Sequence, residues 1–270
     1  MTSLLRTCAA ALLAAVVTAL VGACASSPST TPPRAPEPPP PIKQQEASPK
    51  ERAKLHADLG AGYYERGRMD VALEELNEAA ALDPNEARIY DLYGLVYAML
   101  GENARAEQNF QKALSMAPQN SDIRHNWGWY LCSNGHPRES IPQFEMALAN
   151  PLYKTPEVAL INAGRCSIAF NDFTLADNFF RRAQLAAPNN PSAIYGLAVV
   201  AYKQNRIDDA RGWIKRLTQQ PPAPPEALYL GICIERKLAD RSAEQSYISQ
   251  LRNRYPDSAE TRAIPTGSCE

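Results

Sequence analysis

The chain has 270 residues and carries 28 basic and 29 acidic side chains, so its formal net charge is -1. A near-neutral chain gives no electrostatic basis for binding nucleic acid, which usually requires a basic surface. Three histidines, at positions 56, 125 and 136, are too few for a metal cluster. We therefore expect no nucleic-acid partner and no metal or other cofactor. The length suits one elongated domain or two compact ones.

Residues 1–23 have the pattern of a secretion signal. Arg6 precedes the uncharged run CAAALLAAVVTALVGA, which is too short to span a bilayer well. Its end, LVGAC, resembles the lipobox of bacterial lipoproteins, in which the cysteine, here Cys24, becomes the lipidated first residue. The alternative is ordinary cleavage after Ala23, which leaves a free cysteine. Ala25, rather than aspartate, follows Cys24, and in Gram-negative lipoproteins this favours the outer membrane.

Residues 24–50 are typical of a tether. Nine of the 23 prolines lie between Pro28 and Pro49, among almost no apolar residues. Such a segment buries too little surface to offset the entropy of ordering, and proline favours the extended polyproline II form. At about 3.1 Å per residue, the tether would reach roughly 70 Å from a membrane.

From residue 51 to residue 258 the sequence repeats with a period of about 34. One position of each repeat holds a small residue, at Gly60, Gly94, Gly128, Gly164, Ala198 and Gly231. Twelve residues later comes another small residue, and four further on a bulky one, at Leu76, Phe110, Phe144, Phe180, Ile214 and Tyr247. Prolines close five of the six repeats. This pattern is the tetratricopeptide signature.

The repeats predict an all-α fold, a right-handed superhelix of six tetratricopeptide helix-turn-helix units. Small residues let helix A and helix B of each unit approach closely, and the bulky residue fills the space beside them. Proline ends helix B because it lacks an N–H group. The A helices are expected to line a concave groove, and residues 259–270 to form a C-terminal tail.

Aromatic residues gather in the third repeat, in the stretch HNWGWYLCSNG. Trp127 falls on a core position of helix A, which favours packing. Trp129 falls on the face that usually lines the groove, so contact with a partner and packing are both open. His125 and Asn126 flank it, and a single histidine in such a place is more often a satisfied group than a ligand.

Four cysteines remain in the mature chain besides Cys24. Cys132 and Cys166 lie on the A helices of adjacent repeats, which run side by side, so the two side chains can face each other. In an exported protein this predicts a disulfide, with two small buried thiols as the alternative. A loop of this size predicts roughly 3–4 kcal/mol of stabilisation. Cys233 and Cys269 are candidates for a second bridge that pins the tail.

No Cys–His–Asn or Ser–His–Asp arrangement points to nucleophilic chemistry, and the carboxylates are scattered over exposed helix faces. We therefore expect no enzyme and no small-molecule substrate.

The segment from His125 to Cys166 resembles the centre of the type IV pilus biogenesis lipoproteins of the PilF and PilW family, the pilotins. The matching residues are Asn126, Trp127, Gly128, Trp129, Tyr130, Leu131 and Cys132, then Asn150, Pro151, Tyr153, Pro156, Asn162, Gly164 and Cys166. The lipobox, linker and six repeats extend the resemblance over nearly the whole chain. It implies a lipoprotein on the periplasmic face of the outer membrane that helps the pilus secretin reach that membrane and multimerise. It also implies the Cys132–Cys166 disulfide.

We expect the groove to bind a secretin segment through Trp129, Asn126, Tyr130, Asn162 and Arg165, because aromatic side chains are favoured anchors. Asn126 and Asn162 have an alternative role, which is hydrogen bonding to neighbouring helices. The alternative function is a general periplasmic tetratricopeptide lipoprotein that recruits cell-wall or outer-membrane assembly factors.

Overall fold

The computed structural model describes residues 47–219, 222–267 and 269. The expected signal, Cys24 and nearly all of the tether lie outside these residues. Within them the chain forms helices and no strand, and none of the helices is both long and apolar enough to cross a membrane. The helices are α1 (Pro49–Glu65), α2 (Met69–Leu82), α3 (Ala87–Met99), α4 (Asn103–Met116), α5 (Ser121–Ser133), α6 (Pro137–Leu148), α7 (Pro156–Ala169), α8 (Phe173–Ala186), α9 (Pro191–Lys203), α10 (Ile207–Thr218), α11 (Pro225–Lys237), α12 (Arg241–Arg254), α13 (Ala259–Ala263) and the 3-10 helix η1 (Ile264–Thr266).

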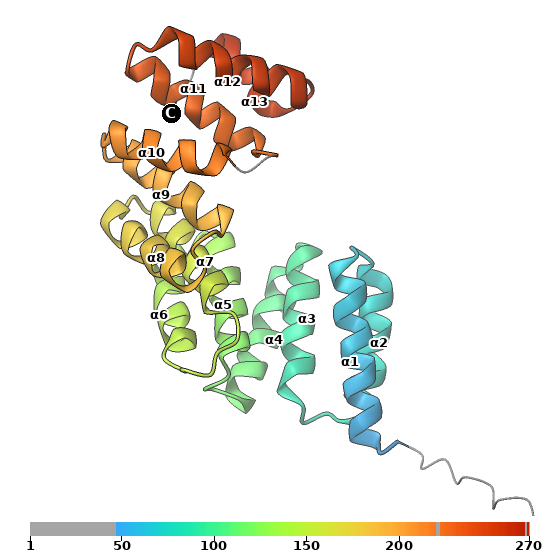
Figure 1. Cartoon of the computed structure of the whole chain (residues 1–270). Helices are drawn as coiled ribbons and strands as arrows, with labels where there is room; N and C mark the ends of the chain where they lie inside the picture. Colours follow the sequence, from blue (N-terminus) through green and yellow to red (C-terminus); the bar gives the residue numbers. More distant parts are fainter. Residues whose placement is uncertain (1–46, 220–221, 268, 270) are drawn as a thin grey trace, which may run out of the picture. The chain divides into compact units, whose positions relative to one another are not determined.

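The helices α1 to α12 pack as six consecutive hairpins, from α1 on α2 to α11 on α12 (Figure 1). The odd-numbered members are the A helices and the even-numbered members the B helices. Successive A helices also contact one another, whereas no comparable contact joins successive B helices in the described part of the chain. The stack therefore curves with the A helices inside, and we call their inner surface the A-helix face. The predicted right-handed superhelix of six tetratricopeptide units is confirmed.

Each hairpin depends on a close approach between a small residue of helix A and a bulky side chain of helix B. A Cβ atom added to Gly94 would lie 2.8 Å from the ring of Phe110. Phe180 faces two glycines in this way, because an added Cβ would lie 2.8 Å from its ring at Gly164 and closer still at Gly196. Gly164 belongs to the same hairpin and Gly196 to the next one, so a single ring sets the spacing of both.

The turn inside each hairpin contains one residue in the left-handed region. Glycine takes this place in the first three turns, and asparagine in the next two. Both residue types adopt this backbone at low cost. The sixth turn uses Ala239, at φ 56°, where a Cβ atom makes the same conformation less favourable.

Local capping sets the first helix boundary. The Oγ atom of Ser48 accepts a hydrogen bond from the backbone of Glu51, and the Glu51 carboxylate accepts one from the backbone of Ser48 at 2.7 Å. Pro49 suits the first helical position because no partner is needed for its nitrogen. The first repeat thus begins two residues before the expected start at residue 51. The tail expected at residues 259–270 begins with α13 and η1.

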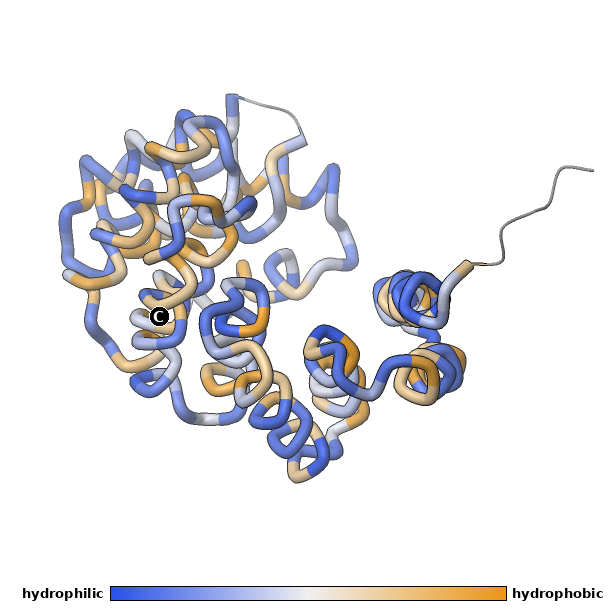
Figure 2. The backbone as a smooth tube through the Cα atoms, turned by 90° about the horizontal axis from the view of Figure 1, so that it is seen from below, coloured by the Kyte–Doolittle hydropathy of each residue, from blue (hydrophilic) through white to orange (hydrophobic). Residues whose placement is uncertain are grey.

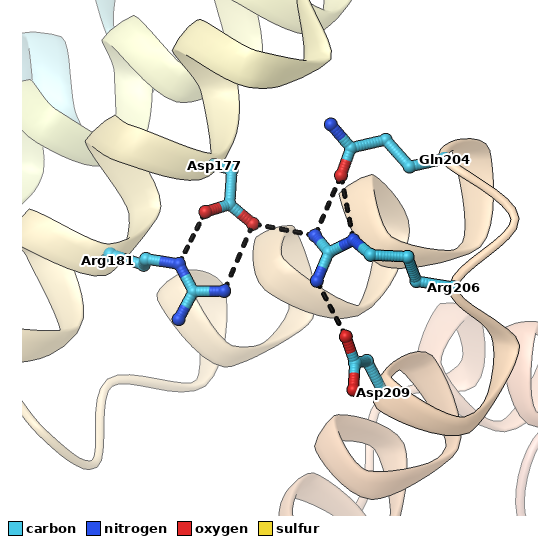
Figure 3. A network of polar contacts seen from close by, with 5 residues as sticks. All are labelled: Asp177, Arg181, Gln204, Arg206 and Asp209. Atoms are coloured by element: carbon cyan, nitrogen blue, oxygen red, sulfur yellow. Dashed lines mark hydrogen bonds and ion pairs between the residues drawn. The ribbon is translucent and has the colours of Figure 1, made fainter.

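Apolar contacts join the hairpins at the core, and ion pairs join them at the rim. Buried side chains form three clusters, in α1–α5, in α6–α9 and from α9 to η1, and Figure 2 shows hydrophobic and hydrophilic residues interspersed along each helix. At the rim, Arg206 binds Asp177 of α8 at 2.8 Å and Asp209 of α10 at 2.7 Å (Figure 3). Asp177 also pairs with Arg181, so this network connects the fourth and fifth hairpins.

The substitution Gly94→Ala tests the close approach. The added methyl group forces the ring of Phe110 or the helix backbones to move, and overpacking of a filled core costs about 1–3 kcal/mol. We expect the free energy of unfolding to fall by that amount in urea denaturation followed by circular dichroism. The matched control is Gly212→Ala in α10, where no neighbouring side chain lies within 4 Å of an added Cβ. Alanine there should raise stability by about 0.5–1 kcal/mol. Equal effects at the two positions would contradict the proposed packing.

Candidate functional site

The A-helix face of α3, α5 and α7 carries hydrogen-bonded polar side chains. The Nδ2 atom of Asn126, in α5, donates to Oδ2 of Asp91, in α3, at 2.8 Å. The adjacent residue of α5, His125, places Nε2 at 2.8 Å from Nδ2 of Asn162, in α7. Both asparagines thus bond to a neighbouring A helix, which is the alternative role expected for them. Their bonds tie three consecutive A helices together.

His125 also contacts the loop between α6 and α7. Its Nδ1 atom lies 2.8 Å from the hydroxyl oxygen of Tyr153. Burial lowers the pKa of His125, which favours the neutral ring. When Asn162 donates to Nε2, the ring proton is on Nδ1 and is donated to Tyr153. Both ring nitrogens are therefore occupied, and His125 holds its neighbours in place.

Gly128 and Gly164 are separated by 36 residues instead of the usual 34, and the two extra residues lie in the α6–α7 loop. Asn150 fixes it, because its Nδ2 donates to Oγ of Ser121 at 3.2 Å and its Oδ1 accepts from the backbone of Leu152 at 3.0 Å. Tyr153 is buried, whereas Leu152 is 84% exposed. These contacts give a physical role to the Asn-Pro-x-Tyr element of the sequence, which attaches the loop to α5.

Within the described residues two disulfides are present, and both match the expected pairs. Cys132 of α5 and Cys166 of α7 are bridged with their Cα atoms 5.8 Å apart. Cys233 of α11 and Cys269 of the tail are bridged with their Cα atoms 5.5 Å apart. The first bridge joins the same two A helices that His125 and Asn162 connect. The second fastens the tail to the last A helix.

Trp129 is half-buried and packs against two apolar clusters, the one in α1–α5 and the one in α6–α9. It lies one turn after His125 and Asn126, and so on the same side of α5. Arg165 stands in the corresponding place one turn after Asn162. Its side chain is exposed, and the described residues give it no hydrogen bond or ion pair. Of the expected site residues, Trp129 and Arg165 therefore have side chains that are accessible to a partner and not fully used in the fold.

Tyr130 does not belong to this surface, and its expected role in partner binding is wrong. Only 5% of it is exposed, and its hydroxyl donates to the backbone oxygen of Asn103 at 3.0 Å. Its ring packs against those of Phe110 and Trp127, with centroids 5.3 Å from each. The physical reason is helix geometry, since one residue beyond Trp129 the side chain turns by about 100° into the core. Trp127 packs in this aromatic group, as its repeat position predicts.

Asp91 is a further site residue, and none of the sequence motifs indicated it. It is 4% exposed, and its Oδ1 atom has no hydrogen-bond partner among the described residues. Burial raises the pKa of Asp91 to about 7, although the hydrogen bond from Asn126 opposes this shift. A signal was available, because Asp91 is the single charged residue in the apolar run IYDLYGLVYAML.

The chemistry of this face suits a protein segment. Amide side chains can bond to a peptide backbone, and a half-buried tryptophan offers apolar contact area. The described parts of the chain contain no group of three or more histidine, cysteine, aspartate or glutamate side chains placed to hold a metal ion.

Comparison with known proteins places the chain among tetratricopeptide-repeat proteins. Family models described as tetratricopeptide or TPR repeat match residues 60–101, 87–120 and 159–230. The type IV pilus assembly protein PilF of Pseudomonas aeruginosa is 26% identical over 210 residues, which cover 78% of this chain and 83% of that protein.

Solved structures agree with this relationship. The crystal structure of PilW, a widely conserved type IV pilus biogenesis factor, has a TM-score of 0.73 at 29% identity and covers 79% of this chain and 98% of that one. The structure of Pseudomonas aeruginosa PilF has a TM-score of 0.72 at 25% identity and covers 82% of this chain and 99% of that one.

Asp91 makes stability depend on pH. Its pKa is about 7 in the folded protein and 3.8 for the ordinary side chain, so the folded state retains a proton that the unfolded chain has released. Stability is therefore lost as pH rises from about 4 to about 7. The substitution Asp91→Asn removes this loss. Its stability relative to the wild type should rise by about 2 kcal/mol between about pH 5 and about pH 8, measured by urea unfolding.

The matched control for this experiment is Asp208→Asn, which removes an exposed carboxylate in the first turn of α10, away from Asp91. A stability difference between Asp91→Asn and the wild type that stays constant with pH would contradict a buried, titrating Asp91.

Proposed function

We propose a function from the premise that this chain belongs to the tetratricopeptide-repeat proteins of type IV pilus biogenesis. It acts as a pilotin, an outer-membrane lipoprotein that binds the pilus secretin and assists its localisation and multimerisation. The observation that supports this proposal most is the A-helix face of α5 and α7, where Trp129 and Arg165 flank amides held by Asp91 and His125.

The hydrogen bonds of this face prepare it for binding. Asn126 and Asn162 each use one amide hydrogen bond to a neighbouring helix, so their remaining amide atoms are available to the backbone of a partner. The Cys132–Cys166 bridge holds the two helices that carry them. Because these groups are already ordered, the binding free energy does not have to offset the entropic cost of ordering them. Trp129 then adds apolar contact area at the centre of the face.

Lipid anchoring and binding act together in this proposal. An acylated Cys24 gains about 0.8 kcal/mol per buried CH₂, and two or more chains hold a protein firmly on a membrane. In this proposal the proline-rich segment that follows acts as a tether and lets the hairpins extend away from the membrane. Holding a secretin-binding surface near the membrane raises the effective concentration of secretin there without any new contact. Anchor and surface are therefore both required for multimers at the outer membrane.

The substitution Cys24→Ala tests the anchor. We expect the protein to become soluble in the periplasm and the amount of secretin multimer in the outer membrane to fall, because the local concentration effect is lost. Fractionation of membranes, followed by electrophoresis of unheated secretin, measures both. Normal multimer levels with a fully soluble protein would contradict the anchoring mechanism.

The substitutions Trp129→Ala and Arg165→Ala test the binding surface. Each should lower co-purification of solubilised secretin about tenfold or more if it removes a central contact. Arg165→Ala changes an exposed side chain that forms no hydrogen bond or ion pair with the described residues, so it is informative even where Trp129→Ala lowers stability. The matched control is Trp213→Ala, on the B helix α10, which should bind secretin like the wild type. Unchanged binding by both A-helix variants would overturn the proposed site.

A further inference from the structure

A cavity of about 240 Å³ opens where α9, α11 and the tail meet. Three tyrosines line it, Tyr195 and Tyr202 from α9 and Tyr229 from α11. Two carboxylates, of Glu226 and Glu260, lie among the lining residues. Tyrosine rings and unpaired carboxylates around one space are the combination that proteins use to hold a positive charge.

The tail forms one wall of this cavity and is fixed at several points. Cys269 is bridged to Cys233 of α11, and its backbone oxygen accepts a hydrogen bond from the hydroxyl of Tyr202 at 3.2 Å. The hydroxyl of Tyr229 donates to the backbone oxygen of Ala263 at 3.4 Å. Ile264 is buried in the adjoining core. The second disulfide therefore helps to form the cavity, because it attaches the tail segment that contains Glu260 to α11.

The carboxylates at this cavity are not neutralised by the protein. In the described ranges, neither Glu226 nor Glu260 forms a hydrogen bond or an ion pair. The pKa of Tyr195 is raised to about 12, first by burial and then by the charges of Glu226 and Glu260. The nearby Arg165 lowers this pKa, but by less. Lys203 also lines the cavity, but it is exposed and pairs with neither carboxylate. The surroundings of Tyr195 are thus favourable for an added cation.

A similar contact already exists inside the protein. The ammonium group of Lys237 lies 4.1 Å from the centroid of the Tyr202 ring. An attraction of this kind contributes about 0.5–1 kcal/mol at exposed sites and more when water is excluded. The ring of Tyr195 offers the same chemistry to a group that enters from outside.

We propose that this cavity binds a cationic side chain, lysine or arginine, of the protein segment that occupies the A-helix face. The positive group lies against the tyrosine rings and between Glu226 and Glu260, and its aliphatic stem packs on Val199 and Leu230. The identity of the segment rests on the proposed function, whereas the preference of the cavity for a cation does not. A partner segment would thus extend from the α5–α7 region to α11 and present a basic residue there.

The test uses small probes on the full-length mature protein with both disulfides intact. The cationic probe is N-acetyl-arginine methylamide, and N-acetyl-citrulline methylamide is its neutral counterpart of nearly the same shape. Nuclear magnetic resonance follows the ring signals of the three lining tyrosines. We expect saturable shifts with the arginine probe at millimolar concentration, and about tenfold weaker binding of the citrulline probe.

Variants of Glu226 and Glu260 test whether these carboxylates cause the preference for the arginine probe. The double substitution Glu226→Gln and Glu260→Gln should weaken the arginine probe about tenfold and leave the citrulline probe unchanged. The double substitution Glu74→Gln and Glu78→Gln on α2 removes the same charge far along the chain and should have no effect. Equal affinity for both probes, unchanged affinity in the double variant, or no saturable shift would each overturn the cation site.

The two proposals fail separately. Normal co-purification of secretin by a protein that does not prefer the arginine probe overturns the cation site alone. Preference for the arginine probe in a protein that never co-purifies with secretin supports the cation site and overturns the proposed function.

Discussion

The contact between a glycine backbone and an aromatic ring determines the spacing of this stack. Phe180 lies against Gly164 of its own hairpin and Gly196 of the next, and Phe110 lies against Gly94 in the same way. No larger residue on the A helix would let the backbones approach as closely without displacing the ring. Within the hairpins these contacts hold helix A close to helix B, and Phe180 also sets the approach of the next A helix, α9.

The middle of the A-helix face shows what this spacing permits. The 2.8 Å contacts from Asn126 to Asp91 and from Asn162 to His125 require A helices that lie side by side at short distance. The Cys132–Cys166 bridge requires the same short distance between α5 and α7 and fixes it covalently. Hairpins two to four are therefore held both by core packing and by contacts along their inner surface. A surface fixed in this manner loses little entropy when a partner binds.

Much of the fold follows from the sequence because the repeat period reports steric requirements that recur at fixed intervals. Small and bulky positions predicted the hairpins, and adjacent A helices predicted the Cys132–Cys166 pair. Contacts between repeats were harder to predict, because they depend on the rotation of each helix about its own axis. This rotation decides which side chains face the core and which face the groove. Tyr130 was placed in the groove, yet it points into the core beside Phe110. The burial of Asp91 was indicated only by its place in an apolar run, and not by the repeat pattern. The cavity beside the tail is formed by residues distant in sequence, on which the repeat pattern contains no information.

The central claim is that the A-helix face receives the secretin, and site-specific photo-crosslinking tests it most directly. A photoreactive side chain is placed at position 165 on α7 or at position 78 on α2, in otherwise unchanged protein in living cells. The account predicts crosslinks to secretin from position 165 and none from position 78. Crosslinks from position 78 alone, or equal crosslinks from both, would contradict it.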